Sequence, residues 1–150
     1  MDGAARALAS RKTRTVGAIV PTVDNAEAAR SVTRYLIEIW HKDIAMVAGV
    51  NNGNDRAIER VNGVRMALEE HGLSFAPGYL MEKLYQIAEG RLAAKQLLDL
   101  QNPLTAIMCG NTILALGVLF EYIASGIRIK KDWSVISITI ENNNAPPLKQ

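Results

Sequence analysis

The residues of this chain that could do chemistry are polar groups suited to holding a small ligand. Three segments rich in Asn, Asp and Gly each follow an apolar run: residues 21–25, 49–55 and 110–112. The second segment contains Asn54 and Asp55, whose amide and carboxylate groups can hydrogen-bond a small polar molecule. Groups of this kind on loops favour recognition of a polar ligand.

Two further side chains near these loops have more than one interpretation. Arg60 lies one helical turn beyond Asp55, in the amino-terminal part of a predicted helix, where the helix dipole disfavours a cation. A binding role is one interpretation of Arg60, and a solvated ion pair with Glu59 or Asp55 is the other. Asn111 opens another predicted helix, so its amide can cap that helix or donate to a ligand.

The chain carries no arrangement of residues typical of catalysis. His41 and His71 follow predicted helices, where the dipole favours histidine, and neither has a nucleophile in an elbow-like sequence. No phosphate-cradling GxxxxGKS/T is present, and no GxGxxG follows the first apolar run. The single cysteine, Cys109, excludes an internal disulfide, and its apolar neighbours indicate a packed thiol. We therefore predict that the protein is not an enzyme and uses no metal or other cofactor.

The composition predicts one globular domain. The chain has 150 residues, of which 49% are hydrophobic and 21% charged, which is normal for a folded protein and unlike a disordered one. No apolar run approaches the roughly 20 residues of a membrane helix, and the amino terminus lacks the apolar centre of a signal peptide. We therefore expect a cytoplasmic protein with no membrane partner.

The net charge of +2 is unevenly distributed along the chain. Residues 1–14 carry four cations and one carboxylate, or +3, which leaves −1 for the rest. A basic arm attached to a nearly neutral body can contact phosphate groups, or it can be an ordinary solvated tail. The sequence has no internal repeat and no linker, so we expect a basic arm at 1–14 and a single α/β domain at 15–150.

Apolar runs alternate with helical periodicities along the whole chain. Strands are expected at residues 16–20, 44–48, 79–82, 104–109 and 133–140. Helices are expected at 25–39, from a cap at Asp55 to a stop at Gly72, at about 88–100, and from a cap at Asn111 or Thr112. Their apolar stripes are Ala29, Val32, Leu36 and Ile39; Ala57, Val61, Val64 and Leu68; Ala93, Leu97 and Leu100; and Leu116, Leu119, Phe120 and Ile123.

This alternation predicts an α/β fold with a mainly parallel sheet and helices on both faces. Right-handed crossovers place ligands at the carboxyl ends of such strands. The three polar loops occupy that edge, which is where a binding site is expected.

Several motifs, in this order, resemble the LacI/GalR family of transcriptional regulators. Residues 5–26, ARALASRKTRTVGAIVPTVDNA, are similar to the hinge segment and first strand of the family. Residues 24–49 resemble its helix, Gly-His and strand; residues 54–73 match its R-x-x-G-x-x-x-A-L helix; and residues 105–117 match its C-x-N-D-x-x-A-x-G pattern. DWSVIS at 132–137 resembles its last strand. Together the motifs span nearly the whole chain.

The resemblance implies a periplasmic-binding-protein-like, flavodoxin-like lobe that senses a small effector of the sugar or nucleobase class. It implies that Arg60 holds polar groups of the effector, with Asn111 and Asp24 as further hydrogen-bonding partners. Family members dimerise and bind operator DNA, so a homodimer and operator DNA are the implied partners. Residues 5–9 would match the hinge helix.

The hinge resemblance implies a particular contact with DNA. Leu8 would be the leucine that wedges into the minor groove, with Ala5 and Arg6 beside it. An apolar side chain inserted between base steps kinks the duplex, which gives this contact its physical basis.

The departures from the family pattern predict an incomplete sensor. No helix-turn-helix precedes Met1, and most of the first lobe is replaced by a fusion at residues 24–26. Trp40 stands where the family has glycine, Thr112 stands in place of an acidic residue, and the last strand lacks the usual aspartates after it. A half-cleft buries less of a ligand, so effector affinity is expected to be poor. The alternative is a compact flavodoxin-like scaffold or interaction domain, natural or engineered by deletion, with no retained ligand.

Overall fold

The computed structural model describes residues 15–20, 24–100, 104–124 and 134–140, with the side chains of 24–100 and 104–124. Strands and helices alternate in the order β1 (Thr15–Val20), α2 (Asn25–Glu38), β2 (Ile44–Gly49), α3 (Asp55–Glu70), β3 (Leu80–Lys83), α4 (Ile87–Leu98), β4 (Ala106–Cys109), α5 (Thr112–Ala124) and β5 (Ser134–Ile140). No described helix is long and apolar enough to cross a membrane.

The five strands form one parallel sheet in the order β1-β5-β4-β2-β3. β2 lies next to β4 on one side and β3 on the other, so Met46 is opposite both Met108 and Leu80. Every residue of β2 and β4 is buried, which explains why both strands are continuous apolar runs. The predicted α/β fold with a parallel sheet is confirmed.

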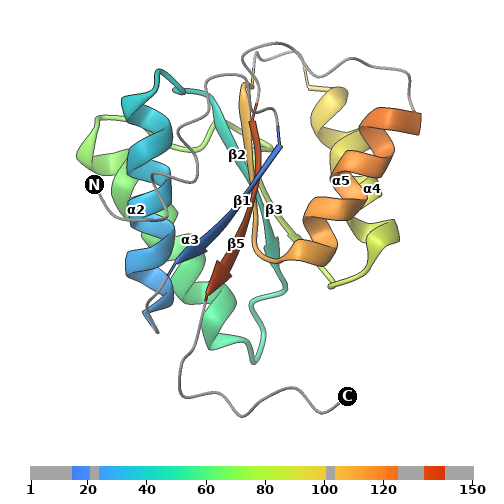
Figure 1. Ribbon diagram of the computed structural model, residues 1–150, viewed down its shortest axis with the longest axis horizontal. Coiled ribbons are helices and arrows are strands. Elements are labelled where there is room, and N and C mark those ends of the chain that lie inside the picture. Colours follow the sequence, from blue (N-terminus) through green and yellow to red (C-terminus); the bar gives the residue numbers. More distant parts are fainter. Residues whose placement is uncertain (1–14, 21–23, 101–103, 125–133, 141–150) are drawn as a thin grey trace.

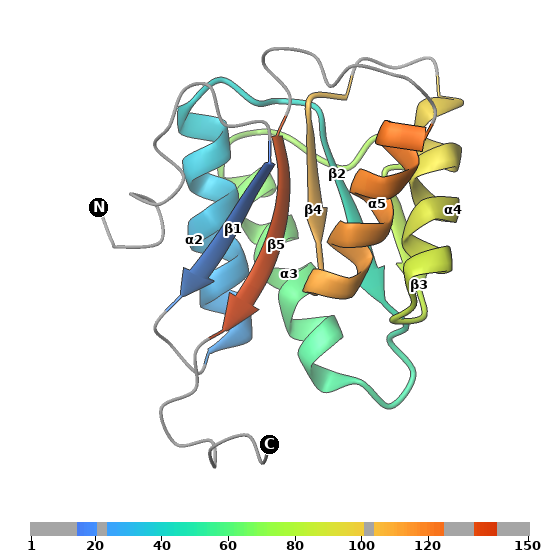
Figure 2. The same cartoon turned by 45° about the vertical axis from the view of Figure 1, so that its right-hand side comes forward.

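The helices form one layer on each face of the sheet (Figures 1 and 2). α2 and α3 cover one face, and α4 and α5 cover the other. Successive side chains of β2 point to opposite faces of the sheet. Met46 packs in the core with α2 and α3, whereas Ala45 and Val47 pack in the core with α4 and α5. The described residues therefore form two cores, separated by a sheet whose strands β2 and β4 are buried on both sides.

The sequence periodicity identified the buried faces of α2 and α3 but not that of α5. Ala57, Val61, Val64 and Leu68 are all buried, and so are the predicted positions of α2 except Ile39, which is 37% exposed just beyond the helix end. In α5 the predicted apolar stripe is not the face that packs in the core, so this prediction is wrong. Phe120 and Ile123 are 45% and 74% exposed, and the buried residues are instead Leu114, Ala115, Gly117, Val118, Glu121 and Tyr122. Because α5 is apolar almost all round, its periodicity alone does not select the face that meets the sheet.

Most element boundaries differ by one or two residues from the sequence predictions, as at β3, α4 and β4. β3 is Leu80–Lys83, α4 is Ile87–Leu98, and β4 is Ala106–Cys109. The Tyr79 carbonyl still accepts a bond from the Met46 N–H at 2.7 Å, so the chain joins the sheet just before β3 begins. Shifts of this size are ordinary at the ends of elements.

Side chains at the carboxyl edge of the sheet cap three helices. Asp24 caps α2, with its Oδ1 accepting a bond from the Glu27 N–H at 3.0 Å. Asn54 caps α3 through the Ala57 N–H at 3.1 Å, so the predicted cap, Asp55, is wrong by one position. Asp55 is instead the first helical residue, because the non-helical backbone of Asn54 turns its amide oxygen onto the first turn. Asn111 caps α5 as one of the two predicted candidates.

The carboxyl ends of α2 and α3 share one backbone motif with different residues. In α3 the N–H groups of Gly72 and Leu73 bond back to Glu69 and Leu68, with Gly72 at φ +71°. In α2 the equivalent position is Trp40, at φ +84°, and its side chain is 87% exposed. This position of the motif favours glycine, because a Cβ is unfavourable in the left-handed region.

Replacing Trp40 with glycine is therefore expected to stabilise the protein by about 1 kcal/mol. The exposed indole contributes little packing, so the relief of backbone strain dominates. The measurement is urea unfolding followed by circular dichroism. Trp40→Ala is the matched control, because it removes the indole and keeps a Cβ at positive φ, and it should give no comparable gain. Equal stabilisation by both variants would contradict the strain argument.

Candidate functional site

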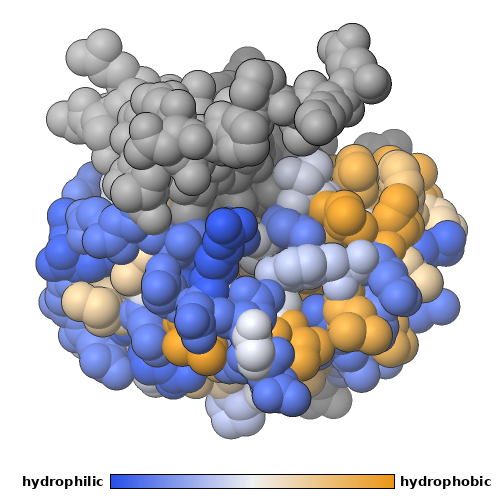
Figure 3. Space-filling model, turned by 90° about the horizontal axis from the view of Figure 1, so that it is seen from below, coloured by the Kyte–Doolittle hydropathy of each residue, from blue (hydrophilic) through white to orange (hydrophobic). Residues whose placement is uncertain are grey.

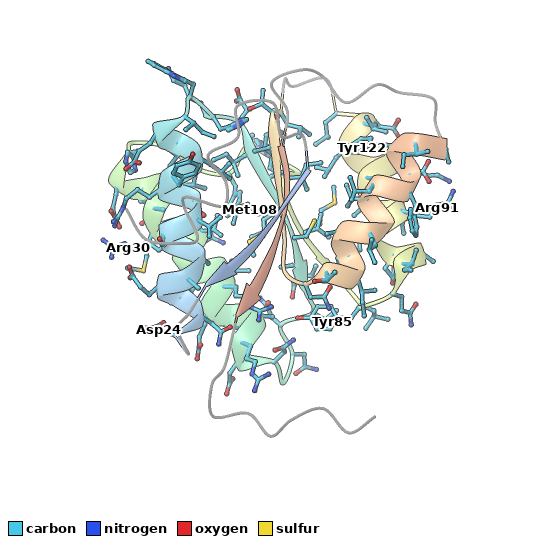
Figure 4. The ribbon with its side chains drawn as sticks, viewed as in Figure 1. Asp24, Arg30, Tyr85, Arg91, Met108 and Tyr122 are labelled. Atoms are coloured by element: carbon cyan, nitrogen blue, oxygen red, sulfur yellow. The ribbon has the colours of Figure 1, made fainter. Side chains whose placement is uncertain are left out.

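The loops at the carboxyl edge of the sheet diverge around β2. β2 leads into α3 on one face, whereas its neighbours β4 and β3 lead into α5 and α4 on the other face. In open α/β sheets, ligands bind where adjacent strands send the chain to opposite faces. Asp24 and Tyr85 both lie at this end of the molecule (Figure 4), so residues from several loops converge here.

Arg60 connects three elements at this edge. Its Nε donates to Asn25 Oδ1 at 3.0 Å, and its Nη1 donates to the Gly110 carbonyl oxygen. Asn25 is the first residue of α2, and Gly110 lies between β4 and α5. Burial lowers the pKa of the guanidinium from its ordinary value, but an arginine of this kind stays charged. Neither sequence interpretation named these two partners, and among the described residues Arg60 forms no ion pair with Glu59 or Asp55.

Tyr85 is a functional candidate that the sequence reasoning missed. Its ring lies so close to Gly49, the last residue of β2, that a Cβ there would come within 2.6 Å of two ring carbons. Its hydroxyl accepts a bond from Asn54 Nδ2 at 3.3 Å. Tyr85 is 39% exposed and comes shortly after β3, so it reaches the same edge from a fourth loop. The usable signal was an aromatic residue following the weakest of the predicted strands.

The predicted site residues lie at one edge but do different things there. We call the set Asn25, Asn54, Arg60, Tyr85 and Gly110 the edge site. Asn54 belongs to it directly, and Asn111 is adjacent to Gly110 while its side chain caps α5. Asp24 is adjacent to Asn25, and its carboxylate caps α2. Asp55 is exposed in the first turn of α3. The predicted hinge residues Ala5, Arg6 and Leu8 lie outside the described residues.

The edge site has the electrostatic character of a place for polar or negative groups. The amino termini of α2, α3 and α5 all begin at this edge, and helix amino termini carry unsatisfied N–H groups and partial positive charge. Arg60 adds a full positive charge. Glu82 moderates the field, and its carboxylate accepts a bond from the Asn51 N–H at 2.7 Å. Hydrogen bonding and charge pairing are therefore what this edge can offer a ligand.

The remaining reactive residue types lie away from this edge or inside the core. His41 Nδ1 bonds Thr105 Oγ1 at 2.8 Å, and His71 caps the end of α3, both near the amino-terminal ends of the strands. Cys109 is fully buried, and burial raises the pKa of its thiol to about 12, so the thiol is protonated at neutral pH. Within the described residues, no three His, Cys, Asp or Glu side chains gather as metal ligands.

Comparison with known proteins establishes the family. The family described as periplasmic binding proteins and sugar binding domain of the LacI family matches residues 8–141. The chain is 34% identical over 134 residues to the transcriptional repressor CytR of Escherichia coli, and 32% identical over 113 residues to the probable repressor ExuR of Bacillus subtilis. These matches cover 86% and 75% of the chain but only 39% and 34% of the relatives. The chain thus spans little more than a third of their length.

Solved structures give the same result. A putative LacI regulator from Bacillus cereus superposes with a TM-score of 0.72 at 31% identity, covering 86% of this chain and 44% of that one. The transcriptional regulator CelR, in complex with cellobiose, superposes with a TM-score of 0.69 at 27% identity, covering 83% and 37%.

A parallel sheet of five strands between two helical layers, with a polar edge, is the architecture of a periplasmic-binding-protein-like lobe. The chain belongs to the family of periplasmic binding proteins and LacI sugar-binding domains. Its relatives are named as transcriptional repressors, in agreement with the prediction that the protein is not an enzyme.

Proposed function

We propose that this chain is the effector-sensing part of a LacI-type transcriptional regulator and that a small polar molecule binds at the edge site. The observation that carries the proposal is Arg60, a partly buried cation that faces the loops where β2 and β4 send the chain to opposite faces. The effector belongs to the sugar or nucleobase class, as the complex of CelR with cellobiose illustrates for one structural relative.

Within this proposal, residues 15–150 form the sensing domain and residues 1–14 form a basic arm. The arm carries a charge of +3, which suits contact with the phosphates of operator DNA. Leu8 would enter the minor groove, with Ala5 and Arg6 beside it. A regulator that binds operator DNA works in the cytoplasm, which is where we place this protein.

Thermal unfolding against a panel of sugars, sugar phosphates and nucleobases tests the sensing proposal. A ligand that binds only the folded chain stabilises it by about 2.7 kcal/mol at a hundredfold excess over Kd. We expect one ligand class to raise the unfolding midpoint, and Arg60→Ala to abolish the rise. Arg56→Ala is the matched control, because it removes the same charge from an exposed position of α3.

The alternative, a scaffold without a ligand, predicts the opposite result. The chain would unfold cooperatively at a midpoint that no member of the panel changes. A midpoint shift that Arg60→Ala leaves intact would instead place binding somewhere other than the edge site.

We further propose that two copies of the chain associate through α5. Ile113, Leu116, Phe120 and Ile123 are 38–74% exposed and spaced three, four and three residues apart, which is the spacing of a seam between two packed helices. Figure 3 shows the apolar surface gathered on this side of the molecule, in contrast to the polar side of α2 and α3. Glu121, the one charged residue of α5, is buried and accepts a bond from Arg91, so the seam itself carries no charge.

Light scattering after size-exclusion chromatography measures the association directly. We expect the native chain to form a dimer and Phe120→Glu to be monomeric, because two like charges would meet without solvent at the seam. Gln96→Glu, an exposed position of α4, is the charge-matched control. A dimer that persists in Phe120→Glu would contradict this interface.

A further inference from the structure

The chain contains two Asn-Gly pairs, Asn52-Gly53 and Asn62-Gly63, and both asparagine side chains are exposed. Asparagine is a chemically labile residue, because the backbone nitrogen that follows it can attack its side-chain carbonyl carbon. Glycine in the next position favours this attack, since it has no Cβ to obstruct the approach and its backbone is the most freely rotating. The two pairs have the same reactive groups and the same access to water, so the backbone around each pair decides whether it reacts.

The first pair lies in an open turn between β2 and α3. The Asn54 N–H donates to the Asn51 carbonyl oxygen at 3.0 Å across this turn, and Gly53 has φ +70°. Beyond the chain neighbours of Gly53, nothing lies within 4 Å of a Cβ built on it, so its backbone is surrounded by open space. Among the described residues, no hydrogen bond holds the Asn52 amide or the Gly53 N–H. The Gly53 nitrogen is therefore accessible, and no hydrogen bond to it must break before it attacks.

The second pair lies in the middle of α3, where the backbone is fixed. The N–H of a residue inside an α-helix donates to the carbonyl oxygen four residues earlier, so the Gly63 nitrogen is already paired. Gly63 is also packed against α2, because a Cβ there would overlap the Ala26 carbonyl oxygen. Ring closure at Asn62 therefore requires α3 to open locally, although the Asn62 side chain is exposed.

We propose that Asn52 is a site of spontaneous covalent modification, at which the folded chain loses ammonia and takes up water. The Gly53 nitrogen, after losing its proton to solvent, forms a bond to Asn52 Cγ. The bond between Cγ and Nδ2 breaks, Nδ2 leaves as ammonia with a proton from water, and a five-membered cyclic imide remains. Water then adds to one of the two imide carbonyl carbons and breaks its bond to the nitrogen. Addition at Cγ yields aspartate, and addition at the backbone carbonyl yields isoaspartate, in which the main chain runs through the side chain.

Isoaspartate at this position changes the start of α3, because it adds one carbon to the backbone of the turn. The hydrogen bond from the Asn54 N–H to the Asn51 carbonyl oxygen spans that turn. Asn54 also caps α3 through the Ala57 N–H and donates to the Tyr85 hydroxyl. A lengthened turn moves Asn54 relative to these partners. The modification therefore loosens the first turn of α3 and the edge site together.

Ageing of the whole chain followed by peptide mapping tests the modification. Cleavage after lysine and arginine places Asn52 in the peptide 43–56 and Asn62 in the peptide 61–65. The folded chain is kept in a mildly alkaline buffer, beside the same chain unfolded in guanidinium chloride, and mass spectrometry measures the rate in each peptide. We expect the folded chain to modify Asn52 at a rate within a few-fold of the unfolded chain. Asn62 should react at least about tenfold more slowly in the folded chain than in the unfolded one, because it reacts only when α3 opens.

Two glutamine variants assign the reaction to its residue. Asn52→Gln should abolish the modification of this peptide, because glutamine would have to close a six-membered ring, which forms more slowly. Asn62→Gln is the matched control, since it makes the same change at the other exposed Asn-Gly pair and should leave the rate at Asn52 unchanged. Folding that slows Asn52 as much as Asn62 would overturn the proposal, and so would modification that fragment spectra locate at another residue of the peptide.

Thermal unfolding of the aged chain tests the effect on α3. We expect the unfolding midpoint to fall as isoaspartate accumulates, which a methyltransferase specific for isoaspartate measures. Asn52→Gln, aged in the same way, should keep its midpoint. Asn52→Asp carries the charge of the other product on an unchanged backbone and should stay close to the fresh native chain. A midpoint as low in Asn52→Asp as in the aged chain would assign the effect to charge and contradict the role of the lengthened turn.

Discussion

Gly63→Ala is expected to lower the free energy of unfolding by about 3 kcal/mol, even though alanine is the better helix former. A Cβ at this position of α3 would overlap the Ala26 carbonyl oxygen and lie 2.9 Å from the Ala26 carbonyl carbon and 3.0 Å from the Ala29 Cβ. The obstacle is the backbone of α2, which cannot rotate away as a side chain can. The two helices must therefore separate, and their shared core loosens.

Urea unfolding measures this effect, and in a thermal scan it corresponds to a fall of about 10 °C. Asn62→Ala is the matched control, since Asn62 is the exposed neighbour of Gly63 in the same helix and gains helix propensity without a clash. We expect that variant to be neutral or slightly stabilised. A Gly63→Ala protein as stable as the Asn62→Ala protein would show that α2 and α3 are not in close contact at this point.

Gly117→Ala is expected to destabilise the other layer by a similar amount, about 3 kcal/mol. A Cβ on Gly117 of α5 would overlap the Ile87 carbonyl oxygen and lie 2.8 Å from the Cα of Gly90. The reverse contact is equally close, because a Cβ on Gly90 would lie 2.5 Å from the Leu114 carbonyl oxygen. The backbones of α4 and α5 thus cross at two facing glycines.

Double variants test whether Gly90 and Gly117 lie at one shared crossing of α4 and α5. Gly90→Ala and Gly117→Ala each add a methyl group to the same crossing. The double variant should therefore lose less free energy of unfolding than the sum of the two single variants, because helices already separated accept the second methyl group more easily. Gly63→Ala and Gly117→Ala lie on opposite faces of the sheet and should be additive within about 0.5 kcal/mol. Additive effects at Gly90 and Gly117 would contradict a shared crossing.

The sequence predicted where the edge site lies, but it identified only some of the residues that form it. Asn54 and Asn111 lie in polar loops that follow apolar runs, and parallel strands bring such loops to one edge. Arg60 stood out as a cation in the amino-terminal part of a predicted helix, where the dipole disfavours it. Asn25 and Gly110 could not be selected, because their role consists of accepting the guanidinium of a residue 35 and 50 positions away. Tyr85 was missed because β3 is short and less buried than its neighbours, which weakens its sequence pattern.

The sequence by itself determined the alternation of strands and helices, the parallel sheet and the family. Short, continuous apolar runs bounded by turn residues fit strands that are buried on both faces, and the periodic helices between them then cover those faces. The stop of α3 at Gly72 and the buried faces of α2 and α3 follow from local residue types.

Only the tertiary structure decided which face of α5 is buried and how the Arg60 charge is held. α5 is apolar on most sides, so its orientation depends on which of its residues are small enough to lie against α4. Gly117 permits close contact with Gly90, whereas Phe120 and Ile123 are too large for that crossing. The position of the Arg60 guanidinium depends likewise on hydrogen bonds to α2 and to the loop after β4, which approach Arg60 only in the folded chain. Periodicity and composition are local properties, but close packing and the pairing of a charge are relations between distant segments.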